Sequence, residues 1–280
     1  MTQGESRSGF TLIELSIALV IIGLIVGGIL VGQDLIKAAE VRAQISQIEK
    51  YNSAVNTFRS KFNAIPGDMA VSTANQFGFN TTACTGAEAF RDGNGLLEGW
   101  PGAPLTQRQE TALFWQDLSS PIAGNLIDGT FPNSEANVVS CSNTLFNLST
   151  TPGILYLGDY LPLGKIGHGN FVYVYSASGY NWYGLSAATS TDNNAILYSG
   201  ASIPVIEAYN IDKKIDDGLP TTGSVRAVYG NAVWTVAVNA PSAASDTTTS
   251  CYNTTSNAYS VSSLANYGNG GNCALSFRFQ

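Results

Sequence analysis

The chain contains 280 residues, and its 20 acidic against 13 basic side chains give a formal net charge of −7. Only 12% of the residues are charged, and the few lysines and arginines are scattered along the chain. Nucleic-acid-binding proteins gather such residues on one face, so the composition argues against that class. The abundance of Gly, Ser, Thr, Asn and Tyr instead suits a loop-rich β structure.

The first feature along the chain is an apolar stretch at residues 10–32, which contains one charge, Glu14, and no proline. As a helix this stretch is about 35 Å long, enough to cross a bilayer core of about 30 Å. A secretory signal peptide has its cleavage site after the apolar run, whereas here the polar leader, residues 1–9, ends just before it. The pattern therefore predicts a membrane-spanning helix rather than a secretory signal.

The sequence GFTLIE at residues 9–14, followed by the long apolar stretch, resembles the class III leader of type IV prepilins and of the pseudopilins of type II secretion. The resemblance implies that a membrane aspartyl protease, the prepilin peptidase, cleaves between Gly9 and Phe10. It also implies that the new amino terminus, on Phe10, is methylated. Residues 1–9 are then a cleaved leader peptide.

Glu14 is the unusual residue of the apolar stretch, because a carboxylate in a membrane costs roughly 2.5 to 3.5 kcal/mol unless it has a partner. The resemblance implies that the Phe10 amine of an incoming subunit pairs with Glu14 of a neighbour in a filament. Such a pair would set the axial offset between copies more than it would add stability. The alternative is a contact between Phe10 and Glu14 within one chain, four residues apart on one helix.

Four glycines lie in the same stretch, as the pairs Gly23 with Gly27 and Gly28 with Gly32. Glycines four residues apart allow helix backbones to approach closely in lipid. The alternative is that they only loosen the helix, at about 1 kcal/mol each relative to alanine. Both interpretations stay open at this point.

The helix is predicted to continue beyond the membrane as a spine over residues 10–62, with residues 10–32 transmembrane. Apolar residues recur at steps of three and four and form one stripe, namely Ile45, Ile48, Tyr51, Val55, Phe58 and Phe62. The turn-forming residues 63–67 then end the helix. We expect the stripe to pack on a globular head that comprises residues 63–280.

Within the head, the pattern predicts helices over residues 107–119 and 204–216. The first follows a capping box of Thr106 and Gln109, and the second follows Pro204, which suits a first turn. At the end of the second helix we expect a solvated group of charges, namely Asp212, Lys213, Lys214, Asp216 and Asp217. Residues 68–102 are expected to be irregular.

The remaining head residues carry strand signals, at residues 154–157, 171–175, 182–185, 195–198, 225–229, 232–238 and 275–279. Gly230 and Asn231 have the composition of a two-residue hairpin turn. Alternation over residues 171–175 indicates either a strand covered on both faces or one with an aromatic face outward. These signals predict an α+β fold in which an antiparallel sheet packs on the spine, which agrees with the pilin-like fold that the resemblance implies.

The four cysteines, Cys84, Cys141, Cys251 and Cys273, all follow the membrane segment, and an even number there indicates disulfides. Four cysteines allow three connectivities. We favour Cys84 with Cys141 and Cys251 with Cys273, because sequential pairing closes two compact loops; four free thiols are the alternative. The polar tail, residues 240–271, reads as flexible by itself. By resemblance to pilins, the loop closed by the last pair forms part of the filament's outer surface.

A weak calcium-site pattern occurs at Asp92, Asn94 and Glu98, where oxygen-bearing side chains alternate with glycines. The alternative is a plain Asp-Gly turn, so no firm metal ligand is assigned and no other cofactor is expected. Calcium is common in major pseudopilins, the secretion relatives that the resemblance includes.

Catalytic signals are weak. The single histidine, His168, lies between glycines and is expected in a turn, and no nucleophile or phosphate-binding motif accompanies it. We therefore expect no enzyme.

The sequence as a whole predicts a structural subunit, major or minor, of a type IV pilus. The expected partners are other copies or related pilins, the prepilin peptidase, an inner-membrane assembly platform and membrane lipid, with no nucleic acid. We expect a single pass through the bacterial inner membrane, with the leader cytoplasmic and the head periplasmic before assembly. The alternatives are a pseudopilin of a periplasmic secretion pseudopilus and a membrane-tethered adhesin or binding protein.

Overall fold

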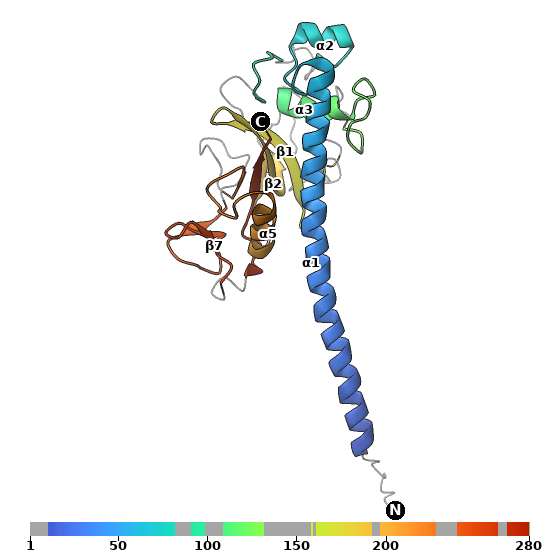
Figure 1. Ribbon diagram of the computed structural model, residues 1–280, viewed down its shortest axis with the longest axis vertical. Helices are drawn as coiled ribbons and strands as arrows, with labels where there is room; N and C mark the ends of the chain where they lie inside the picture. Colours follow the sequence, from blue (N-terminus) through green and yellow to red (C-terminus); the bar gives the residue numbers. More distant parts are fainter. Residues whose placement is uncertain are drawn as a thin grey trace, which may run out of the picture. The chain divides into compact units, whose positions relative to one another are not determined.

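The computed structural model describes residues 11–81, 91–98, 109–131, 158, 161–191, 197–227, 240–262 and 268–279, and all statements below concern these residues (Figure 1). The contacts divide the chain between Glu40 and Val41 into two units. The long first helix, α1, contributes to both, so its two parts are described separately. The predicted α+β class is confirmed.

Helix α1 spans Leu12–Phe62 without a break, close to the predicted spine over residues 10–62. It ends where Asn63 adopts a left-handed backbone conformation with φ of 50°, and the amide of Asn63 still donates to the Arg59 carbonyl at 2.8 Å. A left-handed residue just after the last helical turn is a common helix stop, and asparagine tolerates it better than most residues.

The part of α1 within the second unit, residues 41–62, has a buried face. Of the predicted stripe, Ile45 is only partly buried and the other five positions are buried. Two buried polar residues, Gln44 and Gln47, were not predicted. Gln47 Nε2 donates to the Leu163 carbonyl at 2.8 Å, and Gln47 Oε1 accepts from the Lys165 amide at 3.1 Å. These bonds dock an irregular segment on the helix.

Two further helices lie beside the C-terminal end of α1, as Figure 1 shows. Helix α2, Val71–Phe77, falls where the sequence predicted irregular structure. It is held by tertiary contacts such as Phe77 against Phe62. Because it is only seven residues long, the sequence shows no periodic pattern that would predict it. Helix α3, Gln109–Ser119, agrees with the prediction over residues 107–119.

The main sheet is antiparallel throughout its described pairings. Strands β1 (Asn170–Ala177), β2 (Tyr180–Thr191), β8 (Leu275–Arg278) and β4 (Val225–Arg226) lie in that order. Strand β3 (Leu197–Gly200) also pairs with β2. Ser178 and Gly179 join β1 to β2 with φ of 54° and 77°, as a two-residue hairpin of this twist requires. The predicted strands at 154–157 and 232–238 and the Gly230–Asn231 turn lie outside the described residues.

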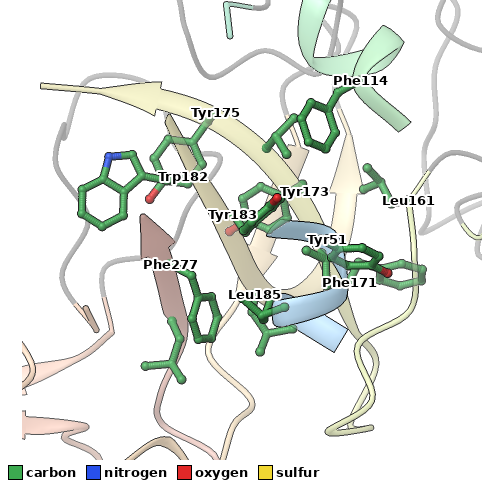
Figure 2. Close-up of a cluster of buried hydrophobic side chains, with 14 of the residues drawn as sticks. Tyr51, Phe114, Leu161, Phe171, Tyr173, Tyr175, Trp182, Tyr183, Leu185 and Phe277 are labelled. Carbon is green, nitrogen blue, oxygen red and sulfur yellow. The ribbon is translucent and has the colours of Figure 1, made fainter. Parts of the chain in front are cut away.

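The core of the second unit lies between α1, α3 and the sheet. Every residue of β1 is buried, which selects the first of the two interpretations of its alternation, a strand covered on both faces. Tyr51 of α1 contacts Trp115 of α3 at a ring distance of 4.8 Å and Tyr183 of β2 at 6.0 Å. Figure 2 shows Tyr51 and Phe114 pointing toward the strands that carry Tyr173 and Tyr183. This aromatic cluster joins the helical and sheet layers.

The polar tail, whose composition by itself is typical of a flexible segment, has regular structure where it is described. Strands β5 (Ser242–Ala243), β6 (Tyr252–Asn253) and β7 (Ala258–Tyr259) form a small separate sheet. This region is held by hydrogen bonds and by the predicted disulfide rather than by aliphatic packing.

Helix α5, Val205–Ile215, confirms the helix predicted over residues 204–216. The charged group predicted to be solvated at its end is only partly exposed, because Asp212 is buried. Asp212 accepts hydrogen bonds from the Tyr259 hydroxyl at 2.7 Å and the Gly218 amide at 3.1 Å. The charge pattern along the helix could not reveal this, since one of these partners lies 47 residues away.

Candidate functional site: the N-terminal segment

The candidate functional site is the first part of α1, residues 12–40, taken by itself. Its apolar side chains are exposed along the whole segment from Leu12 to Ile36. Exposed apolar surface of this extent marks a membrane or protein interaction surface. Among the described residues, α1 is long and apolar enough to cross a membrane, judged by length and composition.

Glu14 lies in the first turn of this helix, where its position is set by Thr11. Glu14 Oε2 accepts hydrogen bonds from the Thr11 amide at 2.8 Å and the Thr11 hydroxyl at 2.7 Å, and the Glu14 amide donates to Thr11 Oγ1 at 3.3 Å. This reciprocal arrangement is a capping box. Sequence reasoning missed the role of Thr11, although the signal Thr-x-x-Glu is present at residues 11–14.

The capping box holds the Glu14 carboxylate at the N-terminal end of α1, where the partial positive charge of the helix favours an anion. Its partners within the described chain are neutral donors. The residues of the predicted cleavage position, Gly9 and Phe10, lie outside the described residues, so the two alternatives for a Phe10–Glu14 contact both stay predictions.

The four glycines lie within the exposed segment. A Cβ atom built at Gly23, Gly27, Gly28 or Gly32 would meet nothing within 4 Å. Within the first unit, the described residues therefore give these glycines no packing partner, which leaves their surface open to another helix.

Residues 6–30 match a family model described as the prokaryotic N-terminal methylation motif. The chain carries a class III prepilin leader. The matched range contains Gly9, the last residue of the leader, and Phe10 and Glu14, which follow it. No curated protein and no solved structure matches the chain.

This motif supports a type IV pilin-like or pseudopilin-like protein. It implies processing by the prepilin peptidase and assembly into multimers. The apolar helix that follows it fits the membrane anchoring of pilins. The antiparallel sheet that follows the long N-terminal helix in the chain likewise fits a pilin-like fold.

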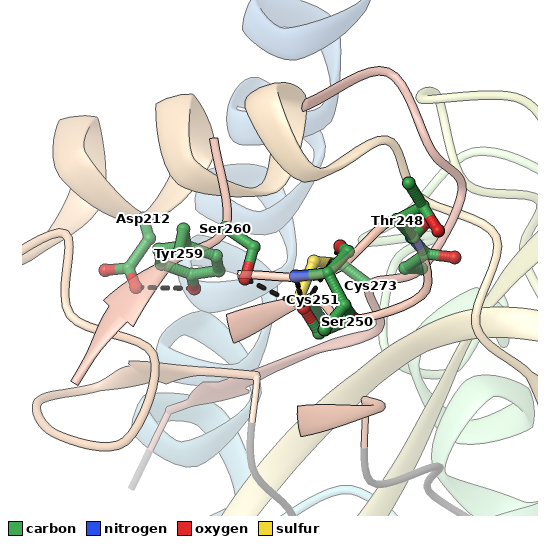
Figure 3. The surroundings of a disulfide bond; sticks show 9 residues. Asp212, Thr248, Ser250, Cys251, Tyr259, Ser260 and Cys273 are labelled. Atoms are coloured by element: carbon green, nitrogen blue, oxygen red, sulfur yellow. Dashed lines mark hydrogen bonds between the residues drawn. A yellow bond between two sulfur atoms is a disulfide. The ribbon is translucent and has the colours of Figure 1, made fainter. Parts of the chain in front are cut away.

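In the C-terminal region, the structure places a disulfide between Cys251 and Cys273, with their Cα atoms 5.0 Å apart. Figure 3 shows this bond near the buried hydrogen bond between the Ser250 and Ser260 hydroxyls, which are 3.0 Å apart. This is one of the two pairs that sequential pairing predicts. Cys84 and Cys141 lie outside the described residues.

The remaining predicted positions lie in the head. His168 adopts a φ of 54° between two glycines of positive φ, which confirms the expected turn. Asn94 belongs to a turn in which its Oδ1 accepts from the Leu96 amide and its Nδ2 donates to Asp92 Oδ2, each at 2.7 to 2.8 Å. The Glu98 amide donates to the Glu110 carboxylate at 2.9 Å.

Proposed function

We propose that this chain is a structural subunit of a type IV pilus, processed after Gly9 and polymerised through its N-terminal helix. The observation that carries the proposal is that the prepilin leader continues directly into a helix whose large apolar side chains are exposed from Leu12 to Ile36. Such a surface requires lipid before assembly and neighbouring helices after it. Residues 1–9 are the leader, residues 10–62 the spine and residues 63–280 the head of this subunit.

Glu14 has the registry role in this proposal. Processing at Gly9 creates a cationic amine on Phe10, and methylation keeps it cationic. In a low-dielectric filament core, that amine and a carboxylate of a neighbouring copy attract each other strongly. Thr11 supports the proposal because its hydrogen bonds hold the Glu14 carboxylate in one place. The axial offset between copies then follows from the position of this carboxylate.

Before assembly the subunit is proposed to cross the bacterial inner membrane once, with its leader in the cytoplasm and its head in the periplasm. Its partners are the prepilin peptidase, the inner-membrane assembly platform and other copies or related pilins. The pseudopilus of type II secretion is the second candidate, because the methylation motif is shared by pilins and pseudopilins. A pseudopilus would keep the same subunit contacts but remain in the periplasm.

The proposal is tested in the cells that produce the protein. Mass spectrometry of the mature chain should show a methylated Phe10 at its start. Filaments sheared from the cells and viewed by electron microscopy should contain the protein. A Glu14→Ala variant should be processed but give no filaments, whereas Glu49→Ala, which removes an exposed carboxylate from the same helix, should assemble normally.

Four outcomes would contradict parts of the proposal. A mature chain that still begins at Met1 would exclude the prepilin interpretation. Filaments of normal yield from Glu14→Ala would exclude the registry role. Processed protein that stays in the periplasm, protected from protease added to intact cells, would favour the secretion pseudopilus over the pilus. A processed chain that never polymerises would favour a membrane-tethered binding protein.

A further inference from the structure

We propose that the head binds a calcium ion among the carboxylates of Asp68, Asp92 and Glu110. One oxygen atom from each of these carboxylates lies within 4.8 Å of the other two. Ca²⁺ binds oxygen at about 2.4 Å, so two oxygens bound to one ion lie at most about 4.8 Å apart. The spacing therefore suits one shared ion. This inference concerns the head alone and does not rest on the proposed function.

Asp68 supplies an observation beyond the clustering of acids. Its side chain is only 2% exposed, and its Oδ2 accepts a hydrogen bond from the Gly95 amide at 2.8 Å. Its other oxygen, Oδ1, is buried without a hydrogen-bond partner among the described residues. A buried carboxylate oxygen without a donor is costly. A bound cation would satisfy this oxygen.

Glu110 is also fully buried, and it is held so that both of its oxygens keep acceptor capacity. Its Oε1 accepts from the Asp92 amide at 3.2 Å, and its Oε2 accepts from the Glu98 amide at 2.9 Å. A carboxylate oxygen has about two lone-pair directions, so the bonds from the described residues leave about one direction on each oxygen. The amides thus orient Glu110 without using up its capacity for a metal ion.

A neighbouring ion pair brings the three carboxylates together. Arg91 makes two hydrogen bonds to Asp117, at 2.8 and 2.9 Å, and the Gly67 amide donates to the same carboxylate at 2.7 Å. Gly67 precedes Asp68 and Arg91 precedes Asp92 in the chain. Glu110 lies seven residues before Asp117 on α3, which places both on one face of the helix. Each proposed ligand is therefore anchored by this pair.

The donor set indicates the class of ion. The group contains carboxylate oxygens and no histidine or cysteine, which favours a hard cation over zinc or copper. Ca²⁺ accepts six to eight oxygens in irregular geometry, whereas Mg²⁺ requires a near-ideal octahedron. The sequence pattern pointed to Asp92, Asn94 and Glu98; the structure instead brings Asp92 beside Asp68 and Glu110, which lie 24 residues before it and 18 after it.

The test is calorimetric titration of CaCl₂ into the mature full chain in detergent micelles, after removal of metal with EDTA. Calcium sites in extracellular modules have dissociation constants of about 10⁻⁴ to 10⁻³ M, so the titration covers this range. We expect one ion per chain. Asp92→Asn removes an exposed ligand, so it should leave the fold intact and weaken binding by at least about tenfold. Glu110→Gln should abolish binding.

The control is Asp217→Asn, which removes an exposed carboxylate from a different acidic group, formed with Asp212 and Asp216. It should bind calcium as the wild-type chain does. A wild-type chain that shows no binding would overturn the proposal and leave a shared proton as the occupant of the carboxylate group. Unchanged affinity in a folded Asp92→Asn variant, or lost affinity in Asp217→Asn alone, would overturn the assignment of these ligands.

Discussion

Arg91 and Asp117 form a buried ion pair in which both carboxylate oxygens accept a hydrogen bond from the guanidinium group, at 2.8 and 2.9 Å. Their side chains are at most 1% exposed. The pair also binds the backbone of Gly67, through the Asp117 carboxylate and through Arg91 Nη1, which donates to the Gly67 carbonyl at 3.2 Å. It therefore ties the segment after α1, the segment at residues 91–98 and α3 to one another.

The first prediction concerns this ion pair. Asp117→Asn should lower the free energy of unfolding by about 3 to 5 kcal/mol, because it leaves the Arg91 charge buried without its counter-charge. The comparison is Lys50→Ala, which breaks the exposed pair of Lys50 and Asp128 and should cost much less, because water screens an exposed pair. Urea denaturation of both variants measures the difference, and equal losses would contradict the prediction.

The second prediction concerns Gly67, whose φ is +84°. A Cβ at this position would lie 2.2 Å from the backbone oxygen of Glu110, a contact that no side-chain rotation relieves. Gly67→Ala should therefore cost at least about 2 kcal/mol, from the left-handed conformation and the displaced helix α3. Gly95→Ala provides the matched control, since Gly95 also has positive φ but open space around its Cβ position. Thermal unfolding should show the larger loss for Gly67→Ala.

The third prediction concerns the C-terminal disulfide. Replacing both Cys251 and Cys273 with alanine should lower the free energy of unfolding by about 3 kcal/mol, because the bond closes a loop of 22 residues and so restricts the unfolded chain. Guanidinium denaturation without reductant compares the variant with the wild-type chain. Identical midpoints would show that the hydrogen bonds of the small sheet suffice to hold this region.

The fourth prediction concerns pH and the buried carboxyl group of Asp212. Burial raises the pKa of Asp212 to about 7, although hydrogen bonds from Tyr259 and Gly218 lower it in part. An aspartate in an unfolded chain has a pKa of about 3.9. Between these values the folded chain keeps the proton that the unfolded chain has lost, so this group's contribution to stability falls as the pH rises from about 4 to about 7.

Asp212→Asn isolates this contribution. The free energy of unfolding of the wild-type chain minus that of the variant should decrease over this pH range and then level off. Tyr259→Phe removes a hydrogen bond that lowers the pKa of Asp212, so this pKa should rise further. In the Tyr259→Phe background, the stability contribution of Asp212 should therefore keep falling to a higher pH than in the wild-type chain. Denaturation at a series of pH values measures both. A difference that stays constant or rises with pH would contradict the assignment.

The fifth prediction concerns the membrane segment. Gly27→Ala meets no neighbour in the isolated chain and should favour the helix by roughly 0.5 to 1 kcal/mol. Circular dichroism in detergent should therefore show the same or higher helix content. The yield of sheared filaments should nevertheless fall, because the methyl group would block close helix approach. Val31→Ala, which removes bulk nearby, is the control, and a normal filament yield from Gly27→Ala would exclude the packing role.

Much of the fold could be predicted because its signals are local. The apolar run and the three-and-four periodicity lie within one segment, so they placed α1 close to its observed bounds of Leu12 and Phe62. Helix α5 followed from Pro204 and its apolar face in the same way. Helix α2 was missed, because a seven-residue helix contains too few turns to show a period.

The prepilin leader and the long apolar helix are thus determined by the sequence itself, since both are defined by consecutive residues. The contacts of Gln47 with Leu163, of Asp212 with Tyr259, and of Asp92 with Glu110 were decided only by the tertiary structure. In each case a polar group becomes buried because a partner from a distant segment satisfies or surrounds it. The local sequence around one residue does not indicate which distant residue will contact it in the folded chain.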